Sequence, residues 1–484
     1  MVSDYIPVSQ QKLEYLLLLL LIIGSLNFLM ISADLSGYQF DIDYSEGFII
    51  EDTSRLIDSG ELYLEPSLDN GFESVKYPPL YFIILGVIGS IANLGFLTGR
   101  IINLIALGGI FCLIYLFMKE RNISSNFIPL IFLIPYLTAF TGLTLRTDIL
   151  ALFFSFTGIY LFEKKQIYGA ALALIFAFLT KQIFIAGFGA VNLYLLLQID
   201  FSKIIQQLKQ QDFEKIVKEN MDIWKFNIAY VVGLSVSIIA IQIWSPYFLQ
   251  NTLFANIGGF NLRWELLTWA HFVFLPIFSL ASYYIYISRD WMLGSYFFLS
   301  IATMILQMTR GGAWIHPTLQ PFLASVVCVS MLYSRFEIVR KPVTALLILQ
   351  TLIFFAAPMV SGNIFDVSQM DDRNQGADSE ILRQVENSES NVFVEHIGYE
   401  LEAGDNPSPE IWGIYEQQSA EKLSNDEVTE FFRQQNYTKI ITYKRIDNLG
   451  IDDYIREKYE VTDRYERYDM LLNKENWRVY EWTG

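Results

Sequence analysis

The chain has 484 residues, 53% of them hydrophobic, and repeated long apolar runs, which is typical of a protein with many membrane-spanning helices. The formal net charge is −17 and the sequence contains no basic stripe, which argues against nucleic acid as a partner. The two cysteines, Cys112 and Cys328, each lie inside an apolar run, so the sequence offers neither a disulfide framework nor a thiolate metal site.

Apolar runs long enough to cross a bilayer recur from the N-terminus to about residue 361. The first run is too long for a signal peptide and lacks a small-residue cleavage site, so we interpret it as a membrane helix. A further run, 79–97, is interrupted by three glycines. The expected spans are 13–33, 100–118, 126–144, 182–199, 226–248, 267–287, 291–308, 315–334 and 343–361, with shorter ones at 148–162 and 167–180.

Basic connectors define the expected orientation, because cytoplasmic loops of membrane proteins carry an excess of lysine and arginine. These connectors are Lys119/Arg121, Lys164/Lys165, 201–225, Arg289 and Arg335–Lys341. With the N-terminus in the cytoplasm, alternating helices place the C-terminal part outside the cell membrane. This arrangement is consistent only if 79–97 does not cross. We therefore predict about eleven spans with 79–97 at the outer face, the alternative being a twelfth span and one loop that breaks the charge rule.

The first long polar segment, 33–79, is strongly acidic and is expected to be an outer loop. Between Ala33 and Pro78 it contains eleven acidic and two basic residues. Apolar residues at helical spacing between 49 and 57 predict an amphipathic helix that ends at Gly60 and lies on the membrane surface. Asp41, Asp43 and Glu46 precede its first turn. Such carboxylates can bind a divalent cation or supply a general base, although a solvated acidic loop is the more common origin of this pattern.

Three more polar groups lie at helix ends expected on the same outer side. Ionisable side chains near a bilayer are costly and often functional, and lysine and arginine suit a phosphate group. The alternatives are a side chain that extends to the interface, a topological anchor and a short turn between helices. The three groups are Arg146-Thr147-Asp148, Thr180-Lys181-Gln182, and the segment in which Gly311-Gly312 separates Arg310 from His316.

The composition becomes polar and acidic after about residue 361. Residues 361–484 contain 13 basic and 27 acidic residues. The pattern predicts strands at 391–394, 438–443 and 477–482 and a helix at 426–436. We therefore expect a helical membrane domain at 1–361 and a small α/β extracytoplasmic domain at 362–484, which is large enough for its own core.

Four motifs in order resemble those of the GT-C glycosyltransferases, a class of polytopic membrane enzymes. The class includes the protein mannosyltransferases of glycosyltransferase family 39 and the lipid A aminoarabinose transferases. The motifs are Asp43-Tyr44-Ser45-Glu46-Gly47, the stretch from Gly60-Glu61-Leu62-Tyr63 to Tyr77-Pro78-Pro79-Leu80, Arg146-Thr147-Asp148, and Leu179-Thr180-Lys181-Gln182. The resemblance covers about residues 1–360. It implies transfer of a sugar from a polyprenyl-phosphate donor to a glycan, lipid or protein acceptor at the outer face.

The same resemblance implies roles for individual residues. Asp43 or Glu46 would be the general base, or the ligand of a divalent cation if one is required. Many relatives have an adjacent Asp-Glu pair here, whereas Ser45 precedes Glu46 in this chain, so the choice of base stays open. The implied catalytic residues are Asp43, Glu46 and Asp148, and the implied substrate-binding residues are Asp41, Tyr77, Arg146, Lys181, Arg310 and His316.

A membrane transporter or a flippase for a lipid-linked substrate is the alternative function. Such a protein would also have many helices and interfacial charges, but we would expect charges near the middle of helices and broken helices in paired positions. The charges here gather at one face, and the sequence contains no internal repeat. This pattern favours the transferase.

Overall fold

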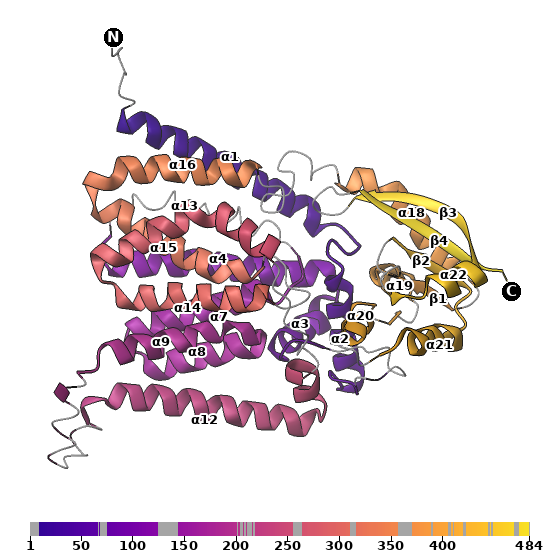
Figure 1. Ribbon diagram of the computed structural model, residues 1–484, viewed down its shortest axis with the longest axis horizontal. Helices are drawn as coiled ribbons and strands as arrows, with labels where there is room; N and C mark the ends of the chain where they lie inside the picture. The colour runs from indigo at the N-terminus through magenta and orange to yellow at the C-terminus, as the bar shows by residue number, and fades with distance from the viewer. Residues whose placement is uncertain are drawn as a thin grey trace, which may run out of the picture.

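The apolar runs form helices that pack side by side into a bundle, and the C-terminal residues form a sheet-containing domain at one end of it in this computed structural model (Figure 1). The structure describes residues 9–65, 67, 75–123, 144–200, 202–203, 207, 210, 215, 218–254, 264–309, 316–356, 370–388, 391–404, 408–409, 411–419, 423–443, 446, 449–468 and 474–483.

The bundle is built from ten helices in the described part of the chain. They are α1 (Gln10–Ser36), α4 (Phe96–Glu120), α7 (Asp148–Glu163), α8 (Ile167–Thr180), α9 (Ala186–Leu197), α12 (Met221–Trp244), α13 (Trp264–Ser288), α14 (Trp291–Met308), α15 (Leu319–Arg335) and α16 (Arg340–Ala356). Short helical turns join them at η2 (Gln182–Ile185), η3 (Gln250–Phe254), η4 (His316–Thr318) and η5 (Glu337–Val339).

The chain is a multi-pass membrane protein. Five helices of the described residues are long and apolar enough to cross a bilayer, and four shorter apolar helices accompany them. The five are Gln10–Met30, Phe96–Glu120, Met221–Trp244, Trp291–Met308 and His316–Arg335. The expected total of about eleven spans stays a prediction, because the run 126–144 lies almost wholly outside the described residues.

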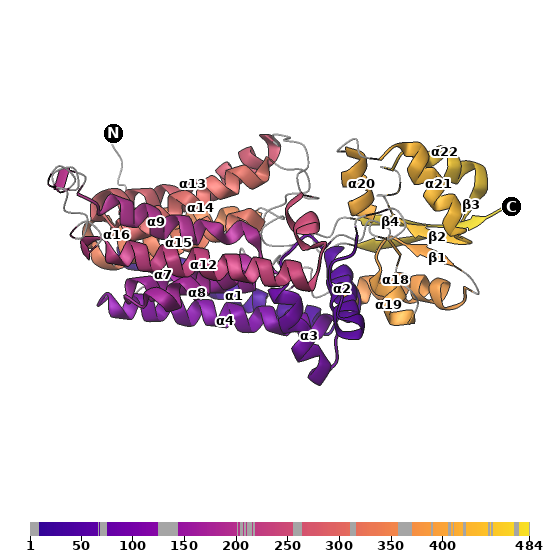
Figure 2. The same ribbon diagram turned by 90° about the horizontal axis from the view of Figure 1, so that it is seen from below.

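The two helices between α1 and α4 lie at the end of the bundle beside the C-terminal domain (Figure 2). The predicted amphipathic helix is confirmed as α2 (Ser45–Ser59), which ends at Gly60 with a left-handed φ of 75°. It begins one residue before Glu46, so Glu46 lies in its first turn rather than ahead of it. The next helix, α3 (Leu80–Ala92), has 13 residues. At 1.5 Å per residue it is about 20 Å long, shorter than the hydrocarbon core of a bilayer.

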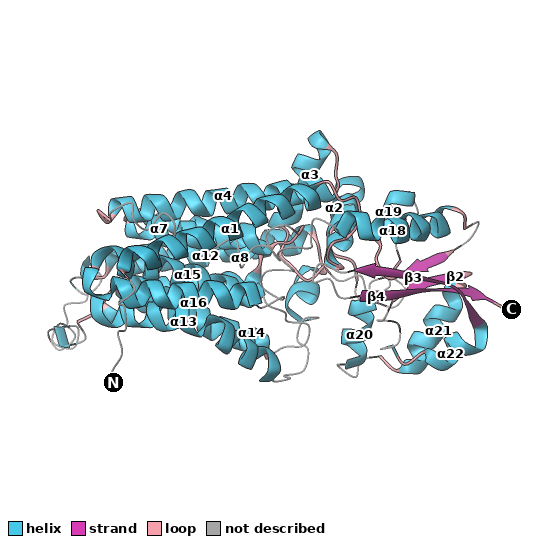
Figure 3. Ribbon diagram, turned by 90° about the horizontal axis from the view of Figure 1, so that it is seen from above, coloured by secondary structure: helices cyan, strands magenta, loops and turns pink. Residues whose placement is uncertain are grey.

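The C-terminal domain is a four-stranded sheet with helices on both faces (Figure 3). The strand order is β1-β2-β4-β3, with β1 and β2 parallel and the other pairs antiparallel. The strands are β1 (Val392–Val394), β2 (Lys439–Thr442), β3 (Tyr459–Tyr468) and β4 (Lys474–Trp482), and the helices are α18 (Met370–Glu386), α19 (Gly398–Ala403), α20 (Ile411–Ser419), α21 (Asn425–Gln435) and α22 (Asp452–Lys458). Three strands and α21 confirm the predicted elements, and α18 confirms the helix that the polar stretch 361–390 predicts, whereas β3, α19, α20 and α22 were not predicted.

Close packing holds α7 and α8 together and fixes where their ends lie. A Cβ atom on Gly158 would lie 2.4 Å from Leu174 Cγ, so the two helices approach through the missing side chain. Helix α7 is also joined to α15, because Gln320 Nε2 donates a hydrogen bond to Ser155 Oγ at 2.9 Å. The first residue of α7 and the residue after α8 are therefore held side by side at one end of the bundle.

Candidate functional site

A buried ion pair joins the ends of α7 and α8. Lys181 follows the last residue of α8, and Asp148 is the first residue of α7. Lys181 Nζ donates a hydrogen bond to Asp148 Oδ1 at 2.7 Å, and their side chains are only 2% and 1% exposed. A carboxylate at a helix N-terminus and a cation after a helix C-terminus are each favoured by the helix dipole. The local structure therefore stabilises both charges at this end of the bundle.

Tyr77 and His316 surround this ion pair. Lys181 Nζ lies 4.8 Å from the centre of the Tyr77 ring, which is a cation–π distance. The backbone next to Tyr77 is held in place, because Gln182 Nε2 donates to the carbonyl of Lys76 at 3.0 Å. His316 begins η4 and lies within electrostatic range of Asp148 and Lys181. Its buried Nδ1 has no hydrogen-bond partner among the residues that the structure describes.

A second ion pair joins the first loop to the segment before α7. Arg146 Nη2 pairs with Asp43 Oδ2, and each side chain is 15% exposed. Asp43 Oδ1 also accepts a hydrogen bond from the backbone N–H of Ser45 at 3.3 Å. The buried Nε of Arg146 makes no hydrogen bond within the described part of the chain. This pair is more accessible to solvent than Asp148–Lys181, and the Nε donor of its arginine is not used by the described residues.

Glu46 is a fully buried carboxylate that ties the first loop to the bundle. Its Oε2 accepts from the backbone of Ile42 at 2.6 Å and of Asp43 at 3.3 Å, and its Oε1 accepts from the backbone of Leu145 at 2.6 Å. Arg100 of α4 donates to both oxygens, at 3.1 and 3.0 Å. With five donors on two oxygens, the Glu46 carboxylate has little capacity for a further hydrogen bond or ligand.

Sequence reasoning missed Arg100. It lies in the first turns of an apolar helix, and its side chain is 1% exposed. A single cation inside an apolar run requires a partner, and the acidic loop was the nearest candidate. The sequence therefore contains a signal for a buried ion pair at Arg100, but the apolar run 100–118 predicts only a membrane span there.

Asp41 is directed toward the C-terminal domain rather than toward the two ion pairs. Its carboxylate accepts from the backbone of Gly47 at 2.6 Å and of Gly398, the first residue of α19, at 2.9 Å. Burial and then the negative charge of Glu46 raise the pKa of Asp41 to about 7, against the hydrogen bond from Gly398 and the charge of Arg467. Asp41 therefore serves as a contact between the two parts of the chain.

The expected site residues divide into three groups in the structure. One cluster at the end of the bundle contains Asp43, Tyr77, Arg146, Asp148, Lys181 and His316. Glu46 and Asp41 lie beside this cluster with their oxygens already bound by backbone N–H groups. Arg310 lies outside the described residues.

The first-loop acids do not suit a divalent cation. In the described residues no group of three or more His, Cys, Asp or Glu side chains is placed to hold a metal ion. Asp43 pairs with Arg146 and Glu46 with Arg100, and a guanidinium at each carboxylate opposes the binding of a second cation.

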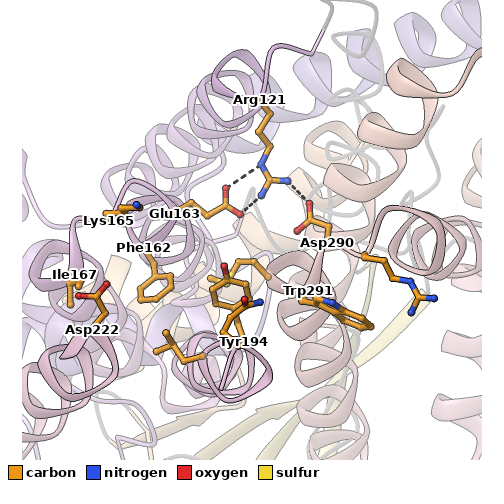
Figure 4. A pocket seen from close by; sticks show the side chains of 13 residues that line it. Arg121, Phe162, Glu163, Lys165, Ile167, Tyr194, Asp222, Asp290 and Trp291 are labelled. Carbon is orange, nitrogen blue, oxygen red and sulfur yellow. Dashed lines mark hydrogen bonds and ion pairs between the residues drawn. The ribbon is translucent and has the colours of Figure 1, made fainter. Parts of the chain in front are cut away.

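A separate cleft of about 530 Å³, whose lining side chains are shown in Figure 4, lies where α4 and α7 end and α14 begins, at the opposite end of the bundle. Arg121, after the end of α4, donates to Glu163 at the end of α7 and to Asp290 at the start of α14, at 3.1 and 2.5 Å. Asp290 also caps α14 by accepting from the backbone of Leu293 at 3.3 Å. Lys165 and Arg289 line the same cleft, so basic connectors predicted to share one side of the membrane gather at this end.

Two solved structures match nearly the whole chain, both of ArnT from Cupriavidus metallidurans. The apo-state structure matches 94% of this chain and 96% of that chain at 10% identity, with a TM-score of 0.52. The structure bound to undecaprenyl phosphate matches 95% and 97% at 10% identity, with a TM-score of 0.56. ArnT is an aminoarabinose transferase of the GT-C class, so the fold expected from the motifs is confirmed. No protein-family model and no curated protein sequence matches the chain.

Proposed function

We propose that the chain is an integral-membrane glycosyltransferase. It transfers a sugar from a polyprenyl-phosphate-linked donor to a glycan, lipid or protein acceptor at the extracytoplasmic face of the cell membrane. The observation that carries this proposal is the pair of neighbouring ion pairs, Asp43–Arg146 and Asp148–Lys181, at the end of the bundle. The likeness to ArnT bound to undecaprenyl phosphate supports a lipid phosphate as the ligand.

In this proposal the donor phosphate binds between Lys181 and Arg146. Lys181 uses one of its three N–H donors on Asp148, and Arg146 Nε has no hydrogen-bond partner among the described residues. Arg310 and His316 complete the phosphate-binding set, and the ring of Tyr77 packs against the Lys181 ammonium. Because negative charge grows on the phosphate as the sugar leaves, these cations stabilise the transition state more than the bound donor.

Asp43 is the general base of the proposed reaction. The donor phosphate competes with Asp43 for the guanidinium of Arg146, which frees a carboxylate oxygen for the acceptor hydroxyl. That hydroxyl loses its proton to Asp43 as its oxygen bonds to the anomeric carbon, and the bond from this carbon to the phosphate oxygen breaks. Asp148 orients Lys181 through their ion pair, whereas Glu46 ties the loop backbone to Arg100 and to the backbone of Leu145 through its five donors. A single displacement of this kind inverts the anomeric configuration.

The distribution of charge supports the proposed orientation in the membrane. Arg121, Lys165 and Arg289 line the cleft at one end of the bundle, and lysine and arginine are enriched in cytoplasmic connectors. The acidic loop and the C-terminal domain lie at the other end (Figure 1). We therefore place the N-terminus in the cytoplasm and both the C-terminal domain and the ion-pair cluster outside.

A transfer assay in nanodiscs tests this function. The purified protein is offered a panel of polyprenyl-phosphate sugars and acceptors, and the release of polyprenyl phosphate is measured. We expect Asp43→Asn to lower the rate by roughly 100- to 10,000-fold, the range for loss of a general base. The matched control is Asp58→Asn on the exposed side of α2, which should leave the rate unchanged.

The possible outcomes separate the alternatives. Release by the wild type and by Asp43→Asn at similar rates would move the base elsewhere, with Asp148 as the next candidate. Folded protein that releases no polyprenyl phosphate from any donor, but moves a lipid-linked substrate between leaflets, would support a transporter or flippase instead.

A further inference from the structure

The loop between α1 and α2, residues 37–44, is held from two sides. From the bundle, Arg100 donates to the carbonyls of Tyr38 and Phe40 at 2.6 and 2.9 Å. From the C-terminal domain, Nη2 of Arg467 in β3 donates to the carbonyl of Asp41 at 2.6 Å. The loop that carries Asp43 therefore has its backbone fixed by an arginine from each part of the chain.

Arg467 is itself fixed inside the C-terminal domain. Its Nε donates to Asp378 of α18 at 3.1 Å, and its Nη1 donates to Glu475 of β4 at 3.0 Å. The side chain is 1% exposed, so these bonds are formed without competition from water. Asp378 also accepts from the hydroxyl of Tyr38 at 2.5 Å. The network thus includes a side chain of the loop as well as its backbone.

Loop 37–44 and the C-terminal domain are also in close contact. The carboxylate of Asp41 bridges Gly47 of α2 and Gly398 of α19 through their backbone N–H groups. A Cβ atom on Gly398 would lie 2.5 Å from Asp41 Oδ2, and one on Gly47 would lie 2.8 Å from Asp41 Oδ1 and from Ile397 Cγ1. Either side chain would force the loop and the domain apart.

We propose that the C-terminal domain positions the base of the transfer reaction and that Arg467 is its positioning residue. The inference rests on the proposed function. Asp43 follows Asp41 by two residues, so a displacement of the Asp41 carbonyl moves the Asp43 carboxylate relative to Arg146 and the acceptor. A misplacement of about 1 Å at a reacting group is enough to lower a rate by roughly 100-fold. The domain thus acts on the reaction through the loop, without contact with the substrate.

The full-length variant Arg467→Lys in nanodiscs tests this proposal, since lysine keeps the charge but cannot form the three-way fork. We expect kcat to fall by roughly 10- to 100-fold, with KM for the donor within about twofold because Lys181 and Arg146 are intact. Amide hydrogen exchange in residues 37–44 should become at least about tenfold faster as the loop loosens. The control is Arg464→Lys on the exposed side of the same strand, which should change neither kcat nor the amide exchange of residues 37–44.

A second variant covers the case in which Arg467→Lys fails to fold. Gly398→Ala keeps every charge, and its added methyl group should push the loop away from α19. It should give the same fall in kcat and the same faster amide exchange. Unchanged loop exchange in both variants, or faster exchange with unchanged kcat, would overturn the proposal. A wild type without transfer activity would overturn the proposed function, whereas faster loop exchange in Arg467→Lys would still support positioning of the loop by the domain.

Discussion

The two ends of the bundle both gather charged side chains at helix ends, but they combine them differently. At the end beside the C-terminal domain, cations and carboxylates pair one to one, Arg146 with Asp43 and Lys181 with Asp148. At the opposite end a single guanidinium, that of Arg121, is shared between two carboxylates. An arginine with two acidic partners has its charge more than neutralised and offers little attraction for another anion.

This is the difference that we expect between the proposed ligand site and a structural tie between helices. The end beside the C-terminal domain contains buried polar atoms that are unpaired, because the N–H donor Arg146 Nε and the ring nitrogen His316 Nδ1 have no hydrogen-bond partner in the described residues. Its Asp148–Lys181 pair is also drier, since these side chains are 1% and 2% exposed while those of Arg121 and Glu163 are 18% and 22% exposed. An electrostatic interaction with a bound phosphate is stronger in the drier environment.

Among the changes that compare the two ends, removal of the Lys181 charge should have the largest effect. We expect Lys181→Met to lower transfer by roughly 100- to 1,000-fold, because a cation that stabilises the leaving phosphate is lost. It should also lower stability by about 3–5 kcal/mol, because Asp148 becomes a buried carboxylate without its partner. The transfer assay and thermal unfolding in nanodiscs measure the two effects.

The double variant Lys181→Met/Asp148→Leu separates these two effects. It removes both buried charges, so most of the lost stability should return. Transfer should stay low, since the phosphate cation is still missing. Recovery of transfer together with stability would mean that Lys181 has only a structural role, and the contrast between the two ends would fail.

The pH dependence of stability should show the second-largest effect, through Asp41. Burial raises its pKa from the ordinary value to about 7, so the folded protein binds this proton more tightly than the unfolded chain does. The stabilisation is complete below the pKa of the unfolded chain and is lost as pH rises through about 7. Between pH 5 and pH 8, Asp41→Asn should gain on the order of 2–4 kcal/mol relative to the wild type.

Thermal unfolding of the wild type and of Asp41→Asn across this pH range measures the effect. The difference between their free energies of unfolding at each pH gives the contribution of Asp41. The amide of asparagine cannot accept from both Gly47 and Gly398, but that cost does not change with pH. A difference that stays constant from pH 5 to pH 8 would contradict the raised pKa.

Much of the fold follows from local sequence patterns. A hydrophobic pattern within the element's own residues predicts the apolar runs, the amphipathic α2 that ends at Gly60, and the strands β1, β2 and β4. Strand β3 was missed because half of the residues in Tyr459–Tyr468 are charged and most of them are exposed, as is common in edge strands. Its inward residue, Arg467, is polar and is buried only because Asp378 and Glu475 arrive from other elements.

The candidate site could be predicted only as a set of residues, not as a set of pairs. The motifs placed Asp43, Arg146, Asp148 and Lys181 at one end of the bundle, and the structure brings them together there. The motif could not distinguish Asp43 from Glu46, because the distinction depends on Arg100, which is 54 residues beyond Glu46. Which carboxylate stays accessible depends on partners that are distant in the sequence. The spacing of residues within a motif does not indicate those partners.

The smallest expected effect is at the opposite end of the bundle, in Arg121→Gln. The side chains of Arg121 and Glu163 are partly exposed, so solvent screens much of their attraction, and the loss of stability should be about 1 kcal/mol. Transfer should stay within about twofold of the wild type, because the cluster that contains Asp43 and Lys181 lies at the other end of the helices. Thermal unfolding and the transfer assay measure both quantities. A loss of transfer as large as that of Lys181→Met would show that Arg121 belongs to the functional site, because a tie between helices that lowers stability by so little cannot account for it.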